Sequence, residues 1–393
     1  MATVISATRR DRRRRFGRLT LGLVLFVAGM TLVPHRFCAR GARAWYDGDP
    51  AAQERLARGV ERHVTAAQGA DTFATGSAKY NGEWLLVTHM MAGLGFGQTA
   101  LEHPEWRDRH VALMSLCIER MLSPEMRRFD QQAWGEDALE TLAGEAGHAG
   151  YLGYFNLLLS FHRALDPGSK HADLNDRITA ALARRIEQSR TLLLETYPGE
   201  VYPADNSTVV ASIALHDRAT GGDHGTLLAR WVERLRLDYT EPRTGLLYQA
   251  VDPATGKPRD APRGSGTCVA QYFLSFMDPA LSRDLDDAVA AHLYREVLGF
   301  GLVREYPTSV EGGGDIDSGP VVFGFGASAT GFCLAGSRQH RHEDRFSRIY
   351  STAYLLGAPL DHGDEHHFVS GGPLGDAILF AMLTAQPARR SDQ

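Results

Sequence analysis

The chain has 393 residues, of which 44% are hydrophobic and 23% are charged, and this balance is ordinary for a folded globular protein. Its length suits one large domain or two small ones. A formal net charge of −5 with interspersed signs gives no support to nucleic-acid binding, so we expect no nucleic-acid partner.

The N-terminus has the composition of a membrane-targeting segment. Residues 9–18 are arginine-rich and directly precede the apolar residues 19–33. A basic stretch followed by about 15 apolar residues is typical of a signal peptide or a short signal anchor. Because the arginines stay in the cytoplasm, we expect the rest of the chain in the periplasm. We favour an uncleaved anchor in residues 1–44, with secretion after cleavage as the alternative and residues 45–393 as the main domain.

Most of the remaining chain is predicted to be helical. Residues 69–79 and 245–257 are the main exceptions, the first a loop and the second a β-hairpin with its turn at 252–257. Apolar helices alternate with amphipathic ones in about five to six helical hairpins, at a spacing of roughly 50–60 residues. The predicted helices span residues 51–67, 83–101, 107–122, 148–165, 173–196, 207–220, 224–238, 265–277, 280–298, 320–338, 343–356 and 373–385. This pattern predicts an all-α (α/α)6 barrel, a ring of apolar inner helices surrounded by amphipathic outer ones.

Four polar or glycine-rich loops each lead into a strongly apolar helix. They occur within residues 144–165, 199–217, 262–277 and 311–336. In the second of them, Asn206, Ser207 and Thr208 can all cap a helix, which places Asp205 beside the positive end of its dipole. We therefore expect the four loops to share one polar face, where a ligand site forms.

Several segments carry a family resemblance. They are WGED at 134–137, GYFNLLLSFHRAL at 153–165, GEVYPADN at 199–206, TGLLYQAVDPATG at 244–256, MDPALSRD at 277–284 and DIDSG at 315–319. In these segments, over roughly residues 130–340, the chain resembles the bacterial linalool dehydratase/isomerases. That resemblance implies an (α/α)6 barrel, secreted across the inner membrane, that hydrates, dehydrates and isomerises monoterpene alcohols without a metal or organic cofactor.

The reactive set of that family is rewritten in this chain. Where the family has its two central cysteines, this chain has Tyr202 and Ala211. The family's histidine after the WG motif corresponds to Tyr154, and its methionine there corresponds to Gly150. The asparagines and the aspartate of the motifs, together with the hairpin tyrosine, are retained as Asn156, Asp205, Asn206 and Tyr248. Linalool itself is therefore not the expected substrate.

Acid–base chemistry needs two groups whose surroundings push their pKa values apart. The predicted catalytic residues are Asp205, Tyr202, Glu136, Asp137, Tyr154 and Asp317. The predicted substrate-binding residues are Asn206, Asn156, Tyr248, His148, Trp134, Asp315 and Arg263. Each has a structural alternative: caps or turns for the aspartates and His148, solvated charges for Glu136 and Asp137, and core packing for the tyrosines. Glu145 is a further carboxylate candidate.

The sequence predicts no metal and no organic cofactor. The run DHGDEHH at 361–367 is rich in metal-ligand types, but it has no second cluster of matching spacing, and DxD at 315–317 lacks the further ligands of a calcium loop. Cys38, Cys117, Cys268 and Cys333 show no ligand spacing, and nothing in the sequence requires a disulfide.

Three functions follow from these patterns. The first is a lyase or isomerase of the linalool dehydratase/isomerase type, acting on a small alcohol or terpenoid-like substrate. The second is a glycan-active enzyme of the same architecture: a glycoside hydrolase, polysaccharide lyase or epimerase. The third is a non-catalytic envelope binding protein. The expected partners are a small molecule and the inner membrane, and self-association is left open.

Overall fold

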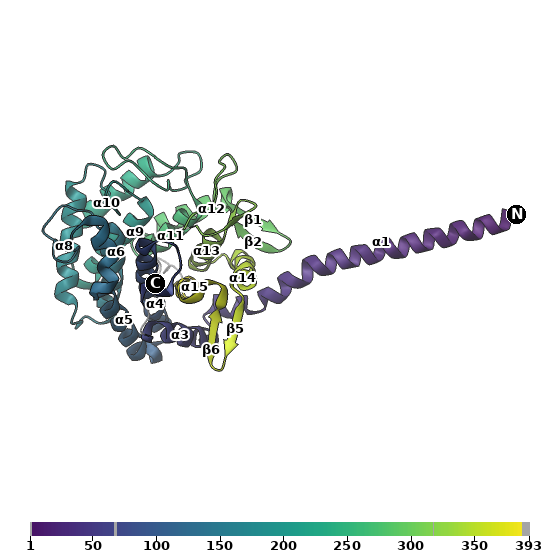
Figure 1. Ribbon diagram of the computed structural model, residues 1–393, viewed down its shortest axis with the longest axis horizontal. Coiled ribbons are helices and arrows are strands. Elements are labelled where there is room, and N and C mark those ends of the chain that lie inside the picture. Colours follow the sequence, from purple (N-terminus) through teal and green to yellow (C-terminus); the bar gives the residue numbers. More distant parts are fainter. Residues whose placement is uncertain (1, 67–68, 317, 387–393) are drawn as a thin grey trace.

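A computed structural model describes residues 2–66, 69–316 and 318–386 of the chain, with side chains from Arg14 onward except at 31 and 32. A long helix, α1 (Ala2–Cys38), projects from a rounded helical body (Figure 1). In the described part of the chain, the segment Arg14–Asp47 is the one helical stretch long and apolar enough to cross a membrane, by length and composition. This agrees with the predicted anchor or signal segment.

Six apolar helices form a closed inner ring. Each contacts the next, and the last returns to the first. In ring order they are α4 (Ala78–Glu102), α7 (Tyr154–Leu165), α9 (Pro203–Thr220), α11 (Gly264–Leu274), α13 (Ala327–Gln339) and α15 (Gly372–Leu383). They are buried along most of their length because neighbours cover them on several sides, as expected of helices that are apolar all round.

Amphipathic helices pack around this ring with their charged faces outward. They are α3 (Pro50–Thr65), α5 (Arg107–Leu122), α8 (Ala172–Gln188), α10 (Gly225–Arg234), α12 (Pro279–His292) and α14 (Glu343–Gly357). Helix α3 covers α4 and α15, α5 covers α4 and α7, and α12 covers α11 and α13. Six inner and six outer helices make this an (α/α)6 barrel, which confirms the predicted fold. Two further helices, α2 (Ala42–Asp47) and α6 (Pro124–Trp134), lie outside this pairing.

Glycines on α4 let the inner helices approach closely. A Cβ atom at Gly93 would collide with Leu158 of α7, and one at Gly95 would collide with Phe380 of α15. The glycines in this apolar run therefore accept side chains from both ring neighbours, at the entropic cost that glycine carries inside a helix.

The β structure differs from the prediction. The expected hairpin at 245–257 keeps its turn, where the Asp252 amide donates to the Lys257 carbonyl at 2.8 Å, but the two sides meet in isolated bridges, at Pro258 and Pro262, and form no strand. Proline has no N–H to donate, so a continuous ladder cannot form there. Elsewhere in the described residues, three short antiparallel hairpins form: β1 (Tyr294–Val297) with β2 (Phe300–Val303), β3 (Val321–Val322) with β4 (Phe325–Gly326), and β5 (Pro359–His362) with β6 (Glu365–Phe368).

Some helix ends also differ. Helix α8 stops at Gln188, and the chain from Ser189 runs non-helically toward the barrel mouth. The helix expected from 320 begins at Ala327, because Phe323 and Gly324 take positive φ and turn the chain into β3–β4. Helix α9 begins at Pro203, whose missing N–H is no loss in a first turn, so Asn206 lies inside the helix and does not cap it.

Two long-range links stabilise the ring. A disulfide joins Cys268 of α11 to Cys333 of α13, with a Cα–Cα distance of 5.1 Å. The buried Arg338 guanidinium of α13 donates to Glu102 of α4 at 2.6 Å and to the Ala385 carbonyl at 2.9 Å. The ion pair holds the first and last parts of the barrel together.

Candidate active site

All six inner helices contribute their N-terminal portions to one cavity of about 380 Å³. The lining includes Glu83 of α4, Tyr154 of α7, Asp205 of α9, Ser265 of α11 and Phe332 of α13, while α15 adds Leu374. Residues 196–202 and the loop that holds Ile316 and Gly319 complete the wall. The predicted shared polar face is therefore present, and a volume of this size suits a small molecule.

Asp205 is a cavity-lining carboxylate that two hydroxyl groups hold in place. The Tyr154 hydroxyl donates to Asp205 Oδ1 at 2.7 Å, and the Thr196 hydroxyl donates to Oδ2 at 2.8 Å. Burial raises the pKa of Asp205 above its ordinary value, and nearby Glu200 adds to this, although the two hydrogen bonds and Lys79 act in the opposite direction. A carboxyl group with a raised pKa can hold and release a proton closer to neutral pH, as acid–base catalysis needs.

A second carboxylate, Glu83, lies in the same cavity. The Tyr197 hydroxyl donates to Glu83 Oε2 at 2.7 Å. Burial and the charge of Glu83 raise the pKa of Tyr197 well above its ordinary value, so this phenol stays protonated as a donor. The Lys79 ammonium lies 3.3 Å from the centre of the Tyr197 ring, which fixes a cation at the same wall.

Glu200 and Tyr202 form the outer part of the polar wall. The Tyr202 hydroxyl donates to Glu200 Oε2 at 3.0 Å, and Lys79 Nζ lies 3.8 Å from the same oxygen. Both Tyr202 and Glu200 line the cavity. Because Lys79 contacts both Glu200 and the Tyr197 ring, it connects Glu200 to the Tyr197–Glu83 pair.

The lining contains both polar and apolar side chains. Acidic, tyrosine and threonine side chains come from residues 79–83 and 196–205, and Tyr154. The apolar part consists of Val87, Met91, Val269, Ile316, Phe332, Leu374 and Ile378. Gln249, Ser265, Ser328 and Ser370 also line the cavity, so a ligand can contact both polar and apolar groups.

The WGED segment does not reach this cavity. His148 is fully buried, with Nδ1 2.7 Å from Asp130 Oδ2 and its ring 4.6 Å from the Trp134 ring. Glu136 approaches His148 Nε2 at 3.4 Å, and Asp137 is paired with Arg127 and accepts from the Leu139 amide. None of the four predicted residues in this cluster lines the cavity, because His148 and Asp137 are engaged with Asp130 and Arg127 instead. Glu145 is likewise outside the lining.

The retained asparagines have structural partners. Asn156 is buried and donates to Thr179 and Ser212 at 3.0 and 2.9 Å, linking α7 to α8 and α9. Asn206 accepts from the Leu194 amide at 2.7 Å and donates to the Leu194 carbonyl at 2.9 Å. Asn206 therefore fixes the chain that carries Thr196 to Asp205, and it supports the site without lining it.

Two further predicted residues, Arg263 and Asp315, lie next to residues that line the cavity. The Arg263 guanidinium pairs with Asp260 at 2.9 Å and with Asp315, and Asp315 also accepts from the Ser318 amide at 2.9 Å. These pairs hold the loop whose neighbours Ile316 and Gly319 line the cavity. Tyr248 is bridged to Pro262 and is outside the lining, and Asp317 lies outside the described residues.

Sequence reasoning missed the α4 wall, which supplies Lys79, Tyr80, Glu83 and Trp84, and also missed Thr196 and Tyr197. A usable signal was present: the loop before α4 also leads from polar residues into an apolar helix, as in the four loops singled out. Residues 190–197 carried no such signal, because they were expected to continue a helix. Two His/Asp groups with metal-ligand spacing occur in the described chain, and neither lines this cavity.

The fold and the site together define an (α/α)6 barrel with a small-molecule cavity at the N-terminal ends of its inner helices. No protein-family model matches the chain, and no curated protein matches it. The linalool dehydratase/isomerase assignment thus stays a prediction.

Among solved structures, the chain is similar to the GH76 α-mannanase of Bacteroides thetaiotaomicron, at 11% identity and a TM-score of 0.46 over 76% of this chain and 84% of that one. A family 76 glycoside hydrolase from a bovine Bacteroides thetaiotaomicron strain is similar at 11% identity and a TM-score of 0.43, over 77% and 68% of the two chains. A family 105 glycoside hydrolase of C. acetobutylicum is similar at 11% identity and a TM-score of 0.37, over 68% and 93%.

Proposed function

We propose that this protein is an enzyme that performs acid–base chemistry on a small hydroxylated molecule, with Asp205 as the central proton-transfer group. The observation that carries the proposal is the environment of Asp205: a cavity-lining carboxyl group held by two donors, with a pKa raised by burial. A non-catalytic binding protein does not need such a group, and perturbed carboxyl groups in clefts are typical of catalytic sites.

The preferred reaction is the addition or removal of water, or the movement of a double bond, in an apolar alcohol. The substrate hydroxyl would lie at the polar wall, and its hydrocarbon part would contact Val87, Phe332 and Ile378. Protonated Asp205 would donate to the departing oxygen, and Glu83 or Glu200 would accept the proton from carbon. This is the chemistry that the family resemblance implies, carried by carboxyl groups and tyrosines in place of cysteines.

A glycan-active enzyme is the second candidate. Three acidic side chains, Glu83, Glu200 and Asp205, line one cavity, and glycoside hydrolysis uses a pair of carboxyl groups on either side of the scissile bond. A sugar ring would place hydroxyl groups against the apolar part of the lining as well, which is why this reaction is placed second.

We also propose that the barrel works outside the cytoplasm, attached by α1. The apolar segment within Arg14–Asp47 supports the attachment, and the Cys268–Cys333 disulfide supports an oxidising compartment, where such bonds persist.

The test is turnover by the full chain, purified in mild detergent, against two substrate panels. The first panel contains tertiary and allylic terpene alcohols, and the second contains short oligosaccharides and aryl glycosides. Dehydration or isomerisation that disappears in Asp205→Asn supports the first candidate, and release of reducing sugar that disappears in the same variant supports the second. Wild-type-like turnover by Asp205→Asn on either panel would refute the role of Asp205.

A further inference from the structure

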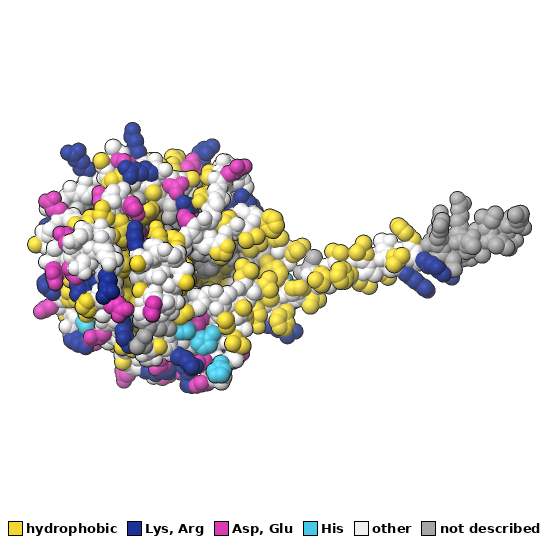
Figure 2. All heavy atoms as spheres, viewed as in Figure 1, with side chains coloured by type: hydrophobic (Ala, Val, Ile, Leu, Met, Phe, Trp, Pro, Cys, Tyr) yellow, Lys and Arg dark blue, Asp and Glu magenta, His cyan; other side chains and the backbone are white. Residues whose placement is uncertain are grey.

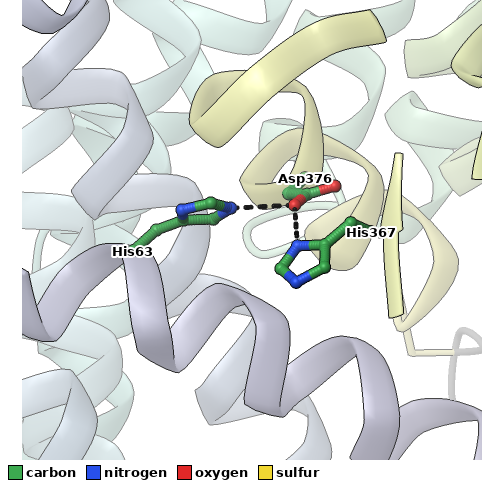
Figure 3. Close-up of side chains that lie close together, drawn as sticks. All are labelled: His63, His367 and Asp376. Carbon is green, nitrogen blue, oxygen red and sulfur yellow. Dashed lines mark hydrogen bonds and ion pairs between the residues drawn. The ribbon is translucent and has the colours of Figure 1, made fainter. Parts of the chain in front are cut away.

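Outside the cavity lining, the structure brings His63, from near the start of the barrel, together with His367 and Asp376, which lie near the C-terminal end of the chain (Figure 3). His63 extends from α3, His367 from β6, and Asp376 from α15. His63 Nε2 lies 2.9 Å and His367 Nδ1 2.8 Å from the same oxygen, Asp376 Oδ2. All three atoms lie within 4.8 Å of one another.

The groups around this cluster hold its side chains in position. Asp376 is only 2% exposed, and its second oxygen, Oδ1, accepts from the Phe368 amide at 2.5 Å. The outer nitrogen of His367, Nε2, lies 3.2 Å from Glu365 Oε2. Metal-binding histidines commonly use their second nitrogen to contact a carboxylate in this way, and metal-binding carboxylates carry further hydrogen bonds.

We propose that His63, His367 and Asp376 form a binding site for one divalent transition-metal ion, with zinc as the expected occupant. Two imidazole nitrogens and one carboxylate oxygen are a common zinc ligand set, and water would fill the fourth position. In a tetrahedral zinc site with bonds of 2.0–2.1 Å, neighbouring donor atoms lie about 3.3 Å apart. The distances from Asp376 Oδ2 to His63 Nε2 and His367 Nδ1 would therefore increase by about 0.5 Å. Zinc would replace the two ring protons that now point at Asp376 Oδ2.

The position of the site gives it a structural consequence. It joins the first outer helix, the last hairpin and the last inner helix, where the barrel closes. Leu374, Gly375 and Ile378, which flank Asp376 on α15, line the cavity, whereas Asp376 does not. A bound ion would therefore fix one wall of the cavity without entering it.

The experiment measures zinc in the tag-free full chain in detergent, after chelation and titration with Zn²⁺, by calorimetry and by elemental analysis. We expect one zinc ion per chain and a higher melting temperature with zinc. His63→Gln should bind zinc at least tenfold more weakly. Without zinc it should keep the wild-type melting temperature, because the glutamine amide can still donate to Asp376. His367→Ala should also lose zinc.

The matched control is His366→Ala, which lies beside His367 but bonds Asp361 at 2.7 Å outside the cluster, and it should bind zinc as the wild type does. A second control, His342→Ala, removes the Asp286–Asp287–His342 group, the other candidate in the described chain. No stoichiometric zinc, or zinc that is lost in His342→Ala and kept in His63→Gln, would overturn the proposal and leave the cluster as a hydrogen-bonded clamp.

Exposed apolar side chains gather on one side of the barrel. Beyond α1, the described chain exposes large hydrophobic side chains mainly in one group of neighbouring elements, the apolar rim: Val297, Leu298, Val322, Phe323, Leu355, Leu356, Leu360 and Val369. They belong to the three hairpins, the end of α14 and the following turn, η6 (Val369–Gly371). Phe323 is 91% exposed and Leu298 is 61% exposed.

The apolar rim is continuous with the base of α1. Helix α14 contacts α1, β2 and η6, and β2 contacts β4. His35 of α1 packs against Phe300, and Phe37 packs against Tyr354. Figure 2 shows hydrophobic side chains gathered on the side of the barrel from which α1 leaves. A patch of this kind marks an interaction surface, and here the neighbouring apolar helix indicates which one.

We infer that the apolar rim rests in the interfacial layer of the membrane that α1 crosses. A helix that spans the bilayer brings its own attachment point to the lipid surface, and the exposed side chains at that point bury apolar area there. This inference rests on α1 being a membrane span and is independent of the reaction proposed above.

The test places the environment-sensitive fluorophore NBD on Leu298→Cys and on Phe323→Cys in the full chain, in nanodiscs of phosphatidylcholine and phosphatidylglycerol. Spin-labelled lipids should quench both at least twofold. Leu237→Cys is the control, because Leu237 is an exposed apolar residue outside the rim and should not be quenched. Equal quenching at all three positions, or none, would overturn the inference. A blue shift of the NBD emission that grows with protein concentration, without quenching by lipid, would show that the apolar rim binds a second copy of the chain instead of the membrane.

Discussion

The Tyr154 hydroxyl donates a 2.7 Å hydrogen bond to Asp205 Oδ1, and this bond joins the first turns of two neighbouring inner helices. On its other oxygen, Asp205 accepts from Thr196, which is held near by the contacts of Asn206 to Leu194. The carboxyl group is thus fixed from both sides and still lines the cavity, which makes it the natural target for substitution.

Asp205→Asn should abolish turnover and stabilise the fold. General acid–base groups contribute about 100-fold to 10,000-fold in rate, so kcat should fall by at least about 100-fold. Burial raises the pKa of Asp205 in the folded state. The protonated carboxyl group therefore contributes its full stabilisation below the pKa of the unfolded state, and this stabilisation is lost as pH rises through the pKa of the folded state. The variant lacks that loss, so its free energy of unfolding should exceed that of the wild type at neutral pH.

Denaturant titrations of both proteins across the acidic to neutral range measure this difference. The gap should close as pH falls below the unfolded pKa of aspartate. Asp238→Asn, at an exposed aspartate paired with Arg234, is the control and should change neither rate nor stability appreciably. A less stable Asp205→Asn protein at neutral pH would show that the charged carboxylate stabilises the fold.

Tyr154→Phe should shift the pH–rate profile. Its hydroxyl favours the ionised form of Asp205, so removing it raises the pKa of that carboxyl group further. Whichever form of Asp205 is active, the limb of the profile that reports it should move to higher pH, and kcat/KM should fall about tenfold to 100-fold. Tyr248→Phe is the control, because Tyr248 does not line the cavity. An unshifted profile in Tyr154→Phe would show that this limb of the pH–rate profile does not report the ionisation of Asp205.

Removal of the disulfide should weaken the barrel substantially. Cys268 and Cys333 are separated by 65 residues, for which loop-closure entropy predicts a contribution of about 4 kcal/mol to the free energy of unfolding. The double variant Cys268→Ala, Cys333→Ala should unfold at lower denaturant concentration than the oxidised wild type. A reducing agent should lower the denaturant midpoint of the wild type toward that of the variant and leave the midpoint of the variant unchanged. Equal midpoints under oxidising conditions would contradict the disulfide pairing.

The buried Arg338–Glu102 pair should matter far more than pairs on the outer helices. Arg338→Ala leaves a partly buried Glu102 carboxylate without its cation, which costs about 3–5 kcal/mol in the free energy of unfolding. Arg234→Ala breaks an exposed pair with Asp238 and should cost no more than about 0.5 kcal/mol. Urea midpoints of the two variants, compared with the wild type, measure both effects; equal losses would contradict the ring-closing role of Arg338.

The sequence by itself determined the helices and their pairing. Whether a helix is apolar all round or on one face depends on its own residues, so inner and outer helices could be assigned from periodicity alone. The same local reasoning located Asp205 at the start of a buried helix, and the family resemblance pointed to Tyr154 and Tyr202. All three line the cavity. The apolar N-terminal segment was also visible as composition.

Only the tertiary structure decided which helix ends meet. Glu83 bonds Tyr197 over a separation of 114 residues, and the wall formed by α4 exists because α15 returns to it and closes the ring. The same closure brings His63 to His367 and Asp376, which supplies the second cluster that the DHGDEHH run lacks in sequence. The WGED segment, by contrast, does not line the cavity. Periodicity specifies which face of a helix is buried, whereas the partners at its ends depend on long-range packing that no local pattern encodes.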